Sequence, residues 1–457
     1  MSVENQLADL SESQLKNLFN QKGKLNILDN YRGQKRENKP VFIEAIKFFL
    51  VLLFWIGASF GGALAATFAA VILTPMLLKP FGLPEEIIKF AAATAPLAAV
   101  MTFIPINAML LVLFERKFLA LLTTRLGPNR VGPNGLLQTF ADALKLLFKE
   151  DIVPAKADKV LFFLAPALFF TPSVIAFLPL MSVAGGGIGP FARTEFPSSL
   201  LFVIAVSSLA VMGLIMAGWA SNNKYSLIGG LRSTAQAISY EIPFVLGIVS
   251  FIVLVGSLNL KEIGTRQSNG ILDWNIFAAG TFLNPQNFTP LGIGLSILLA
   301  VLMPVLAFLI YFCTLAEVNR IPFDLPEAES ELVSGFNTEF TGMKFALFFL
   351  AEYTNLFIVS TLLAIIFFGS TYSGIPTFDT FLANSLKLTP IGDLSWFPGA
   401  TILLIKSYLF IGLAIWIRAT LPRFRSDQLM GLAWKVLIPI SLVLVVLSAI
   451  CRTFLII

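Results

Sequence analysis

The sequence contains no histidine, only two cysteines and few charged residues. The absence of histidine from all 457 residues excludes a His-based zinc or iron site, an imidazole haem ligand and a Ser-His triad. The two cysteines, Cys313 and Cys451, lie far apart in apolar runs, whereas an iron–sulfur cluster needs about four thiolates. We therefore expect no metal and no redox centre in this chain, so any redox chemistry would belong to a partner or to a bound small molecule.

Charged residues make up only 13% of the chain, whereas a soluble domain usually carries about 25%. Hydrophobic residues make up 56%, and the mean hydropathy is +0.82. This composition argues against a soluble globular enzyme and excludes a disordered, collagenous or disulfide-rich chain. It predicts an all-α polytopic membrane protein, because a helix satisfies its own backbone groups within the bilayer.

Long apolar runs mark the expected membrane spans, since a helix needs about 20 apolar residues to cross a bilayer. We predict nine spans, at about 43–78, 86–114, 160–183, 198–218, 236–258, 289–313, 343–369, 399–421 and 433–456.

Lys and Arg residues favour one side of the predicted membrane. Cytoplasmic loops carry an excess of these residues. The N-terminal tail holds seven of them and the loop 115–159 holds eight, whereas the four loops on the opposite side hold five in total. We therefore expect the N-terminus to face the cytoplasm. This bias accounts for the net charge of +5, so we expect no nucleic-acid partner.

The first long loop contains more than a connector needs. Clustered arginines and two Gly-Pro-Asn turns follow Glu115, and an amphipathic helix is expected over about 134–149. Such a helix would lie across the ends of the spans at the membrane surface. A simple surface anchor would explain the helix, but it would not explain the turns and arginines.

Two further segments place carboxylates near the membrane. Glu241 falls within an apolar span, where a carboxylate is costly and is by default a functional candidate; local pairing with Arg232 is the alternative. The segment Glu317–Glu339 holds six acidic residues in 23 positions with Arg320 as its only base. Crowding and partial burial would raise their pKa values and let them titrate as a group. A solvated acidic loop is the alternative, and Glu352 in the next span favours a buried path.

Several long motifs, in order, resemble one protein family. They are Glu115–Lys117, Gly127–Pro133, Ala141–Lys145, Gly229–Pro243, Glu317–Glu331, Lys344–Tyr353 and Arg418–Met430. The family is the quinone-tunnel membrane subunit of respiratory complex I, known as the H subunit of bacterial NADH–quinone oxidoreductase. The resemblance runs from about residue 86 to the C-terminus. It implies an eight-span core over 80–457, which leaves a polar basic extension over 1–41 and an extra transmembrane helix over 42–79.

The resemblance also implies roles for individual residues. The quinone tunnel would involve Arg116, Arg125, Arg232, Phe323 and Phe336. Proton coupling would involve Asp142, Glu241, Glu317, Asp324, Glu327, Glu329, Glu331 and Glu352. The last cytoplasmic loop would be shaped by Arg423 and Asp427. No residue would be catalytic in the covalent sense. Two departures stand out: Phe336-Asn337-Thr338-Glu339-Phe340 replaces the family's usual Tyr-His-Thr-Glu-Tyr, and Ser426 replaces a usual tyrosine.

The function implied is that of a membrane subunit in a proton-pumping NADH–quinone oxidoreductase of the bacterial inner membrane. Quinone, such as ubiquinone, would be its substrate. Its partners would be hydrophilic-arm subunits that hold the terminal iron–sulfur cluster, antiporter-like membrane subunits and the lipid bilayer. Three alternatives remain: a subunit of a related ferredoxin-linked dehydrogenase or hydrogenase, a stand-alone transporter with inverted repeats and broken helices, and a pure membrane anchor.

Overall fold

The computed structural model describes residues 85–125, 127–132, 135–184, 197–277, 290–325, 334–386 and 397–454. All of them belong to one compact unit, Leu52–Ile457. The predicted N-terminal extension and extra transmembrane helix lie outside the described residues. So do Glu327, Glu329 and Glu331 of the acidic segment.

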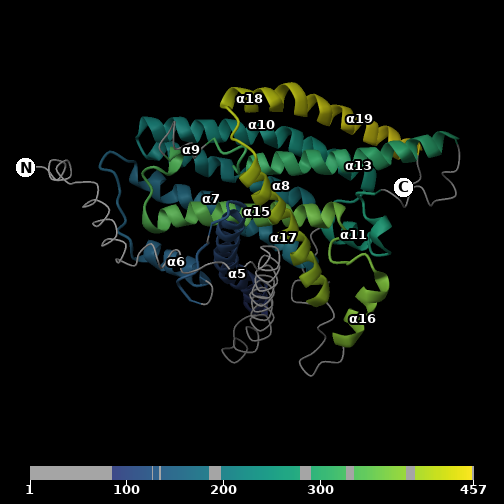
Figure 1. The fold of residues 1–457 in the computed structure, drawn as a ribbon, viewed down its shortest axis with the longest axis horizontal. Coiled ribbons are helices and arrows are strands. Elements are labelled where there is room, and N and C mark those ends of the chain that lie inside the picture. Colours follow the sequence, from purple (N-terminus) through teal and green to yellow (C-terminus); the bar gives the residue numbers. More distant parts are fainter. Residues whose placement is uncertain are drawn as a thin grey trace, which may run out of the picture. The chain divides into compact units, whose positions relative to one another are not determined.

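The described residues are mainly helical (Figure 1), which confirms the predicted all-α membrane fold. The α-helices are α5 (Glu85–Leu122), α6 (Gln138–Phe148), α7 (Lys159–Ala184), α8 (Ser199–Ser208), α9 (Ala210–Ala220), α10 (Lys224–Val255), α11 (Leu260–Thr265), α13 (Pro290–Glu317), α15 (Gly342–Phe367), α16 (Pro376–Leu386), α17 (Phe397–Thr420), α18 (Ser426–Leu432) and α19 (Ile438–Phe454). Short 3₁₀ turns lie at Ile271–Asp273 and Gly335–Asn337, and a π-helical turn at Ala433–Leu437 joins α18 to α19.

Seven segments of the described chain are long and apolar enough to cross a membrane. They correspond to the last seven predicted spans, from α7 to the continuous segment Ser426–Phe454. The predicted span 86–114 is helical throughout and forms most of α5. The predicted amphipathic helix is also present, as α6, with Phe140, Leu147 and Phe148 exposed.

Two details differ from the expected spans. The predicted loop 219–235 is wrong beyond Asn223, because α10 begins at Lys224 and the Asn223 side chain caps it by accepting a hydrogen bond from the Tyr225 backbone N–H at 3.0 Å. The predicted span 198–218 is broken at Leu209 into α8 and α9. Just before the break, the hydroxyls of Ser207 and Ser208 donate to backbone carbonyls one turn earlier, a pattern that bends helices.

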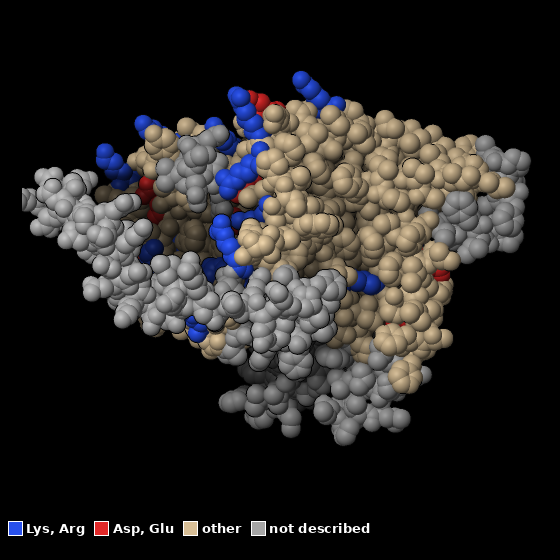
Figure 2. All heavy atoms as spheres, viewed as in Figure 1, with Lys and Arg blue, Asp and Glu red and all other residues tan. Residues whose placement is uncertain are grey.

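The helix α15 lies at the centre of the packing. In its span 83% of the residues in the most apolar stretch are buried, against 22% in the last span. In Figure 1, α7, α10, α13 and α15 run in roughly the same direction, and α5, which packs against α7 and α15, stands steeply to them. Figure 2 shows Lys and Arg gathered over the half of this face that carries α6, α9 and α18. We call this the charged end, and the half that carries α11 and α16 the opposite end.

Candidate functional site

Four side chains from separate parts of the chain meet at the charged end in one buried charge cluster. Glu115 of α5 accepts a hydrogen bond from Arg320, just after α13, at 3.0 Å, and another from the Tyr353 hydroxyl of α15 at 2.8 Å. Its second oxygen pairs with Arg418 of α17. The Glu115 side chain is only 5% exposed and that of Arg320 only 9%. The single carboxylate of Glu115 is thus shared by two guanidinium groups in a largely dry environment.

Arg320 is the fixed cation of this cluster. Its guanidinium lies over the Tyr353 ring, 4.2 Å from the centroid. Burial by itself would lower the pKa of Arg320, but the electrostatic effects of Tyr353, Glu115 and Glu352 outweigh it and raise the pKa. The Nε and Nη2 atoms of Arg320 have no hydrogen-bond partner among the described residues. These buried donors can therefore bind an acceptor oxygen of another molecule.

A cavity of about 260 Å³ adjoins the cluster. For comparison, an apolar cavity of about 150 Å³ can bind benzene, so this one has room for a small ring. Its lining is Val112, Glu115, Arg116, Leu119, Asn319, Arg320, Ile321, Asp324, Phe349, Glu352, Tyr353 and Arg418. The lining is partly apolar and partly charged, and it comes from α5, α15, α17 and the segment that follows α13.

A second, smaller cavity of about 30 Å³ lies next to the first, and Asn319 and Glu352 line both. Glu317 lines the second cavity, and so does Ser207, two residues before the break between α8 and α9. This volume can hold a buried water, which needs two to four polar partners. The two cavities share these two lining residues, Asn319 and Glu352, and one lies beside the buried charge cluster and the other beside Glu317.

The structure brings several of the residues predicted for proton coupling close to these cavities. Asp324 and Glu352 line the first cavity, and Glu317 and Glu352 line the second. Glu241 of α10 lies close enough to Glu317 to act on it electrostatically. Asp142 lies on α6 and pairs with Arg116 at 2.6 Å, which ties α6 to α5.

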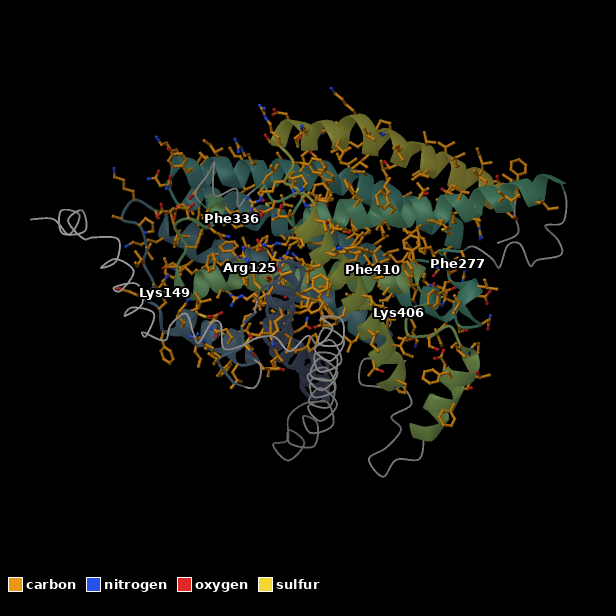
Figure 3. The ribbon with its side chains drawn as sticks, in the orientation of Figure 1. Arg125, Lys149, Phe277, Phe336, Lys406 and Phe410 are labelled. Carbon is orange, nitrogen blue, oxygen red and sulfur yellow. The ribbon has the colours of Figure 1, made fainter. Side chains whose placement is uncertain are left out.

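The residues predicted for the tunnel are more dispersed. Only Arg116 lines the first cavity. Arg125 is exposed beyond the end of α5, in the same half of Figure 3 as Lys149, and Arg232 is half-buried on α10. Phe323 and Phe336 are fully buried: Phe323 packs edge-on against Phe312 and Phe336 against Phe348. The described cavities do not include these four, and their tunnel role stays a prediction.

The two residues predicted to shape the last loop make different contacts. Arg423 pairs with Asp324 at 3.2 Å, and the neighbouring Phe424 backbone N–H donates to the Pro322 carbonyl at 3.0 Å. The loop after α17 is thereby held against the segment after α13. Asp427 forms a solvent-exposed pair with Arg425 at the start of α18.

Sequence reasoning did not assign a site role to Glu115, Arg320, Tyr353 or Arg418, which form the centre of the cluster. The sequence did contain a feature that could have pointed to each charged residue of the cluster. Arg320 is the only base in a segment of six acids, and Glu115 and Arg418 stand where apolar spans end. What the sequence could not show was that these span ends converge on one point.

Comparisons with known proteins agree with this architecture. The family model described as NADH dehydrogenase matches residues 95–449. The NADH-quinone oxidoreductase H subunit of Geobacillus thermodenitrificans is 44% identical over 75% of this chain and 89% of its own length. The corresponding protein of Brevibacillus brevis is 43% identical over 79% of this chain and 93% of its own. NADH-quinone oxidoreductase subunit 8 of Rhodothermus marinus is 43% identical over 77% of this chain and 96% of its own length.

These matches cover the part of the chain that supplies both cavities and the buried charge cluster. They confirm the resemblance drawn from the motifs, and the relatives carry the name of a subunit of a larger complex. The chain is a multi-pass membrane protein that belongs to the NADH dehydrogenase family, together with the H subunits of NADH-quinone oxidoreductases.

Proposed function

We propose that the chain is the membrane subunit through which quinone enters a proton-pumping NADH–quinone oxidoreductase of the bacterial inner membrane. It carries no redox centre of its own. Electrons come from an iron–sulfur cluster held by a hydrophilic-arm partner, and the coupled charge passes to antiporter-like membrane partners. The described site supports both halves of this function, a place for a ring and a buried route for protons.

The observation that carries the proposal is the pair of neighbouring cavities. A ring-sized space lined by three arginines shares Asn319 and Glu352 with a water-sized space at Glu317. A quinone carbonyl needs hydrogen-bond donors, and the buried N–H groups of Arg320 can supply them. A proton needs a succession of carboxylates and water, and the second cavity has two carboxylates and room for a water.

The arrangement of α5, α6 and α15 suits entry from the lipid. The first cavity is lined by Val112 and Leu119 of α5 and by Phe349 of α15, and α6 packs against both helices. The apolar face of α6 exposes Phe140, Leu147 and Phe148. A lipophilic quinone could therefore move from the acyl chains past an apolar edge into the charged cavity.

Reduction of the quinone supplies the free energy that drives proton translocation. A quinone takes two electrons from the partner's cluster and two protons to become a quinol. Withdrawal of protons beside Glu352 changes the charge in a poorly solvated region, where electrostatic interactions are stronger than in water. Glu352, Glu317 and Glu241 then share the change in protonation as coupled sites. One unit of pKa shift corresponds to about 1.4 kcal/mol, so a few coupled carboxylates store useful energy.

The test is Glu352→Gln in the assembled complex, measured as quinone reduction and proton translocation per electron. We expect the number of protons moved per electron to fall, because glutamine cannot carry a proton between the two cavities. Glu262→Gln is the control, since Glu262 is an exposed carboxylate at the opposite end of the molecule. Normal reduction and normal pumping in Glu352→Gln would refute the proposed route.

Glu327→Gln and Glu331→Gln test the part of the acidic segment that lies outside the described residues. The same two measurements apply. If both variants reduce quinone and pump protons at the unmodified rate, these two residues have no part in the mechanism.

A further inference from the structure

Both ends of α15 are held by lysine side chains that the proposed mechanism does not use. The helix carries Phe349, Glu352 and Tyr353, which line the first cavity. Lys344 lies in its first turn, at the charged end. Lys406 of α17 reaches the segment just after its last turn, at the opposite end, and Figure 3 shows it in the other half of the molecule from Arg125 and Lys149.

The Lys406 ammonium completes the C-terminus of α15. It donates to three backbone carbonyls, at 2.5 Å to Phe368, 3.1 Å to Ser370 and 2.5 Å to Tyr372, and it lies 4.5 Å from the ring centroid of Trp274. Phe368 follows the last residue of α15, and Ser370 and Tyr372 lie in the segment after it, so the ammonium binds the chain just beyond the helix. A cation near the C-terminus of a helix is favourable, and carbonyls in a membrane need hydrogen-bond partners, so this contact attaches the end of α15 to α17.

Two amides add to the attachment at this end. Gln267 donates to the Ile365 carbonyl at 3.0 Å and accepts from the Gly369 backbone N–H at 2.9 Å, and Asn275 donates to the Ile366 carbonyl at 2.7 Å. The carbonyls of the last turn are thus bound by side chains from outside α15. The C-terminus of α15 therefore has little freedom to slide.

The Lys344 ammonium holds the first turn. It pairs with Asp151 of the α6–α7 linker at 3.0 Å, and it lies 3.6 Å from the ring centroid of Phe163 and 4.8 Å from that of Phe162, both in α7. Its side chain is only 9% exposed. Just before it, the Thr341 hydroxyl accepts a hydrogen bond from the Ile152 backbone N–H at 3.0 Å.

A helix cap does not require a lysine. An ammonium inside a membrane span is costly, and water or a hydroxyl could satisfy the same carbonyls. Beside the amides of Gln267 and Asn275, the Lys406 ammonium adds three charged hydrogen bonds to the segment that ends α15. Lys344 adds an ion pair and two ring contacts at the first turn. At 26 residues α15 is about 39 Å long, and most of its most apolar stretch is buried.

We propose that Lys406 and Lys344 are positioning residues that fix α15 along its axis, and thereby place Glu352 and Tyr353 in the first cavity. The hydrogen bond of 2.8 Å between Tyr353 and Glu115 tolerates only small displacements. This inference rests on the proposed function, because it concerns the site at which quinone and protons are handled.

The test is Lys406→Met in the assembled complex, with kcat and KM for quinone measured per assembled complex. Methionine keeps most of the length of the lysine side chain but removes the donors. Misplacing a reacting group by 1 Å can cost about a hundredfold, so a smaller shift predicts a loss of roughly tenfold in kcat/KM. Lys406→Arg keeps the donors and should restore most of it. Lys261→Met, a half-exposed lysine on α11 at the same end, is the control.

A merely structural role would lower the amount of assembled complex and leave kcat/KM per complex unchanged, and that result in Lys406→Met would overturn the proposal. If Lys406→Met does not assemble, Asp151→Asn decides, since Asp151 is 46% exposed and its loss creates no cavity. A fall of severalfold in kcat/KM supports the proposal, and an unchanged value refutes it. Glu352→Gln in parallel separates the two proposals: if it disturbs coupling while both anchor variants behave normally, only the anchoring of α15 is refuted.

Discussion

Glu115 is the residue on which the buried charge cluster depends. It is the carboxylate that both Arg320 and Arg418 contact. Glu115→Gln would remove the carboxylate that pairs directly with the buried guanidinium of Arg320. Removing one partner of a buried pair typically costs about 3–5 kcal/mol. We therefore expect a marked fall in the thermal midpoint of the assembled complex, measured by the loss of its activity on heating.

The matched control is Asp427→Asn, which breaks the pair with Arg425. These side chains are 71% and 76% exposed, and exposed pairs contribute about 0–1 kcal/mol. The thermal midpoint should hardly change. If Glu115→Gln and Asp427→Asn lowered the thermal midpoint equally, the burial of the Glu115–Arg320 pair would make no difference to its contribution to stability.

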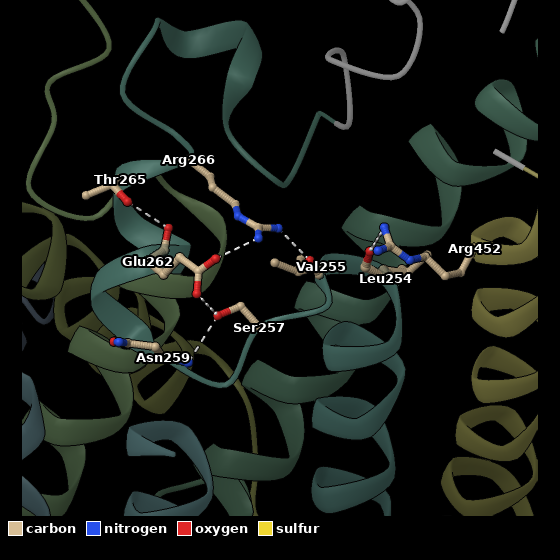
Figure 4. A network of polar contacts seen from close by, with 8 residues as sticks. All are labelled: Leu254, Val255, Ser257, Asn259, Glu262, Thr265, Arg266 and Arg452. Carbon is tan, nitrogen blue, oxygen red and sulfur yellow. Dashed lines mark hydrogen bonds and ion pairs between the residues drawn. The ribbon is translucent and has the colours of Figure 1, made fainter. Parts of the chain in front are cut away.

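Glu262 gives a pH-dependent prediction at the opposite end of the molecule. Figure 4 shows its carboxylate accepting hydrogen bonds from Ser257 at 2.6 Å and Arg266 at 2.7 Å, while Arg266 also donates to the Val255 carbonyl at 2.7 Å. These hydrogen bonds lower the pKa of Glu262 below its ordinary value of 4.5. The pKa of Glu262 in the folded protein lies below its pKa in the unfolded chain, so the ionised carboxylate stabilises the fold above pH 4.5. This stabilisation is lost as the pH falls through the pKa of the folded state.

The measurement compares the thermal midpoints of the unmodified protein and Glu262→Gln at neutral pH and at successively lower pH. The unmodified protein should be more stable at neutral pH, and the difference should shrink below pH 4.5. A difference that stays constant with pH would contradict the assignment. Because Glu262 is about half exposed, we expect the difference to be small.

Two glycines in helices, Gly213 and Gly431, differ in how closely a neighbouring helix approaches them. A Cβ atom on Gly213 of α9 would lie 2.7 Å from the backbone nitrogen of Phe169 in α7, whereas one on Gly431 of α18 would meet nothing within 4 Å. Small residues let helices approach closely in membranes. Gly213→Ala should therefore destabilise the protein by about 1–3 kcal/mol through overpacking.

Gly431→Ala is the control for this helix contact and should be neutral or stabilising by up to about 1 kcal/mol, because alanine favours a helix. The thermal midpoints of both variants provide the measurement. If Gly213→Ala were as stable as Gly431→Ala, the approach of α9 to α7 would be looser than the structure places it.

The existence of the individual helices could be predicted from the sequence better than their breaks and end points. Uninterrupted apolar runs identified α7, α13, α15 and α17, because a span of about 20 apolar residues has few other structures open to it. The break at Leu209 was missed, since the serine hydroxyls before it could equally have pointed to a neighbour. The early start of α10 was missed because its first turns are polar, and hydropathy does not register an Asn cap.

On the scale of the whole molecule, the convergence of distant residues was the part that sequence could not provide. Glu115 and Arg418 are separated by 303 positions, and Glu115 and Tyr353 by 238. Which span ends meet depends on helix packing. The acidic residues were identifiable as candidates, and two of them, Asp324 and Glu352, do line the first cavity. The aromatic residues Phe323 and Phe336 were matched by motif, but they lie in packed clusters of rings.

The uneven distribution of charge predicts how the molecule sits in the membrane. Lys149 is exposed at the charged end (Figure 3), and Thr265, the last residue of α11, is exposed at the opposite end. The positive-inside rule assigns the charged end to the cytoplasm. We expect Lys149→Cys to react with a membrane-impermeant maleimide in inverted vesicles and Thr265→Cys in right-side-out vesicles. The native Cys313 and Cys451 are buried and should stay unlabelled in the unmodified control. Labelling of the introduced cysteine of each variant after detergent treatment would establish that both positions are accessible. If the two variants were labelled with the reverse sidedness, the charged end, with its two cavities, would face away from the cytoplasm.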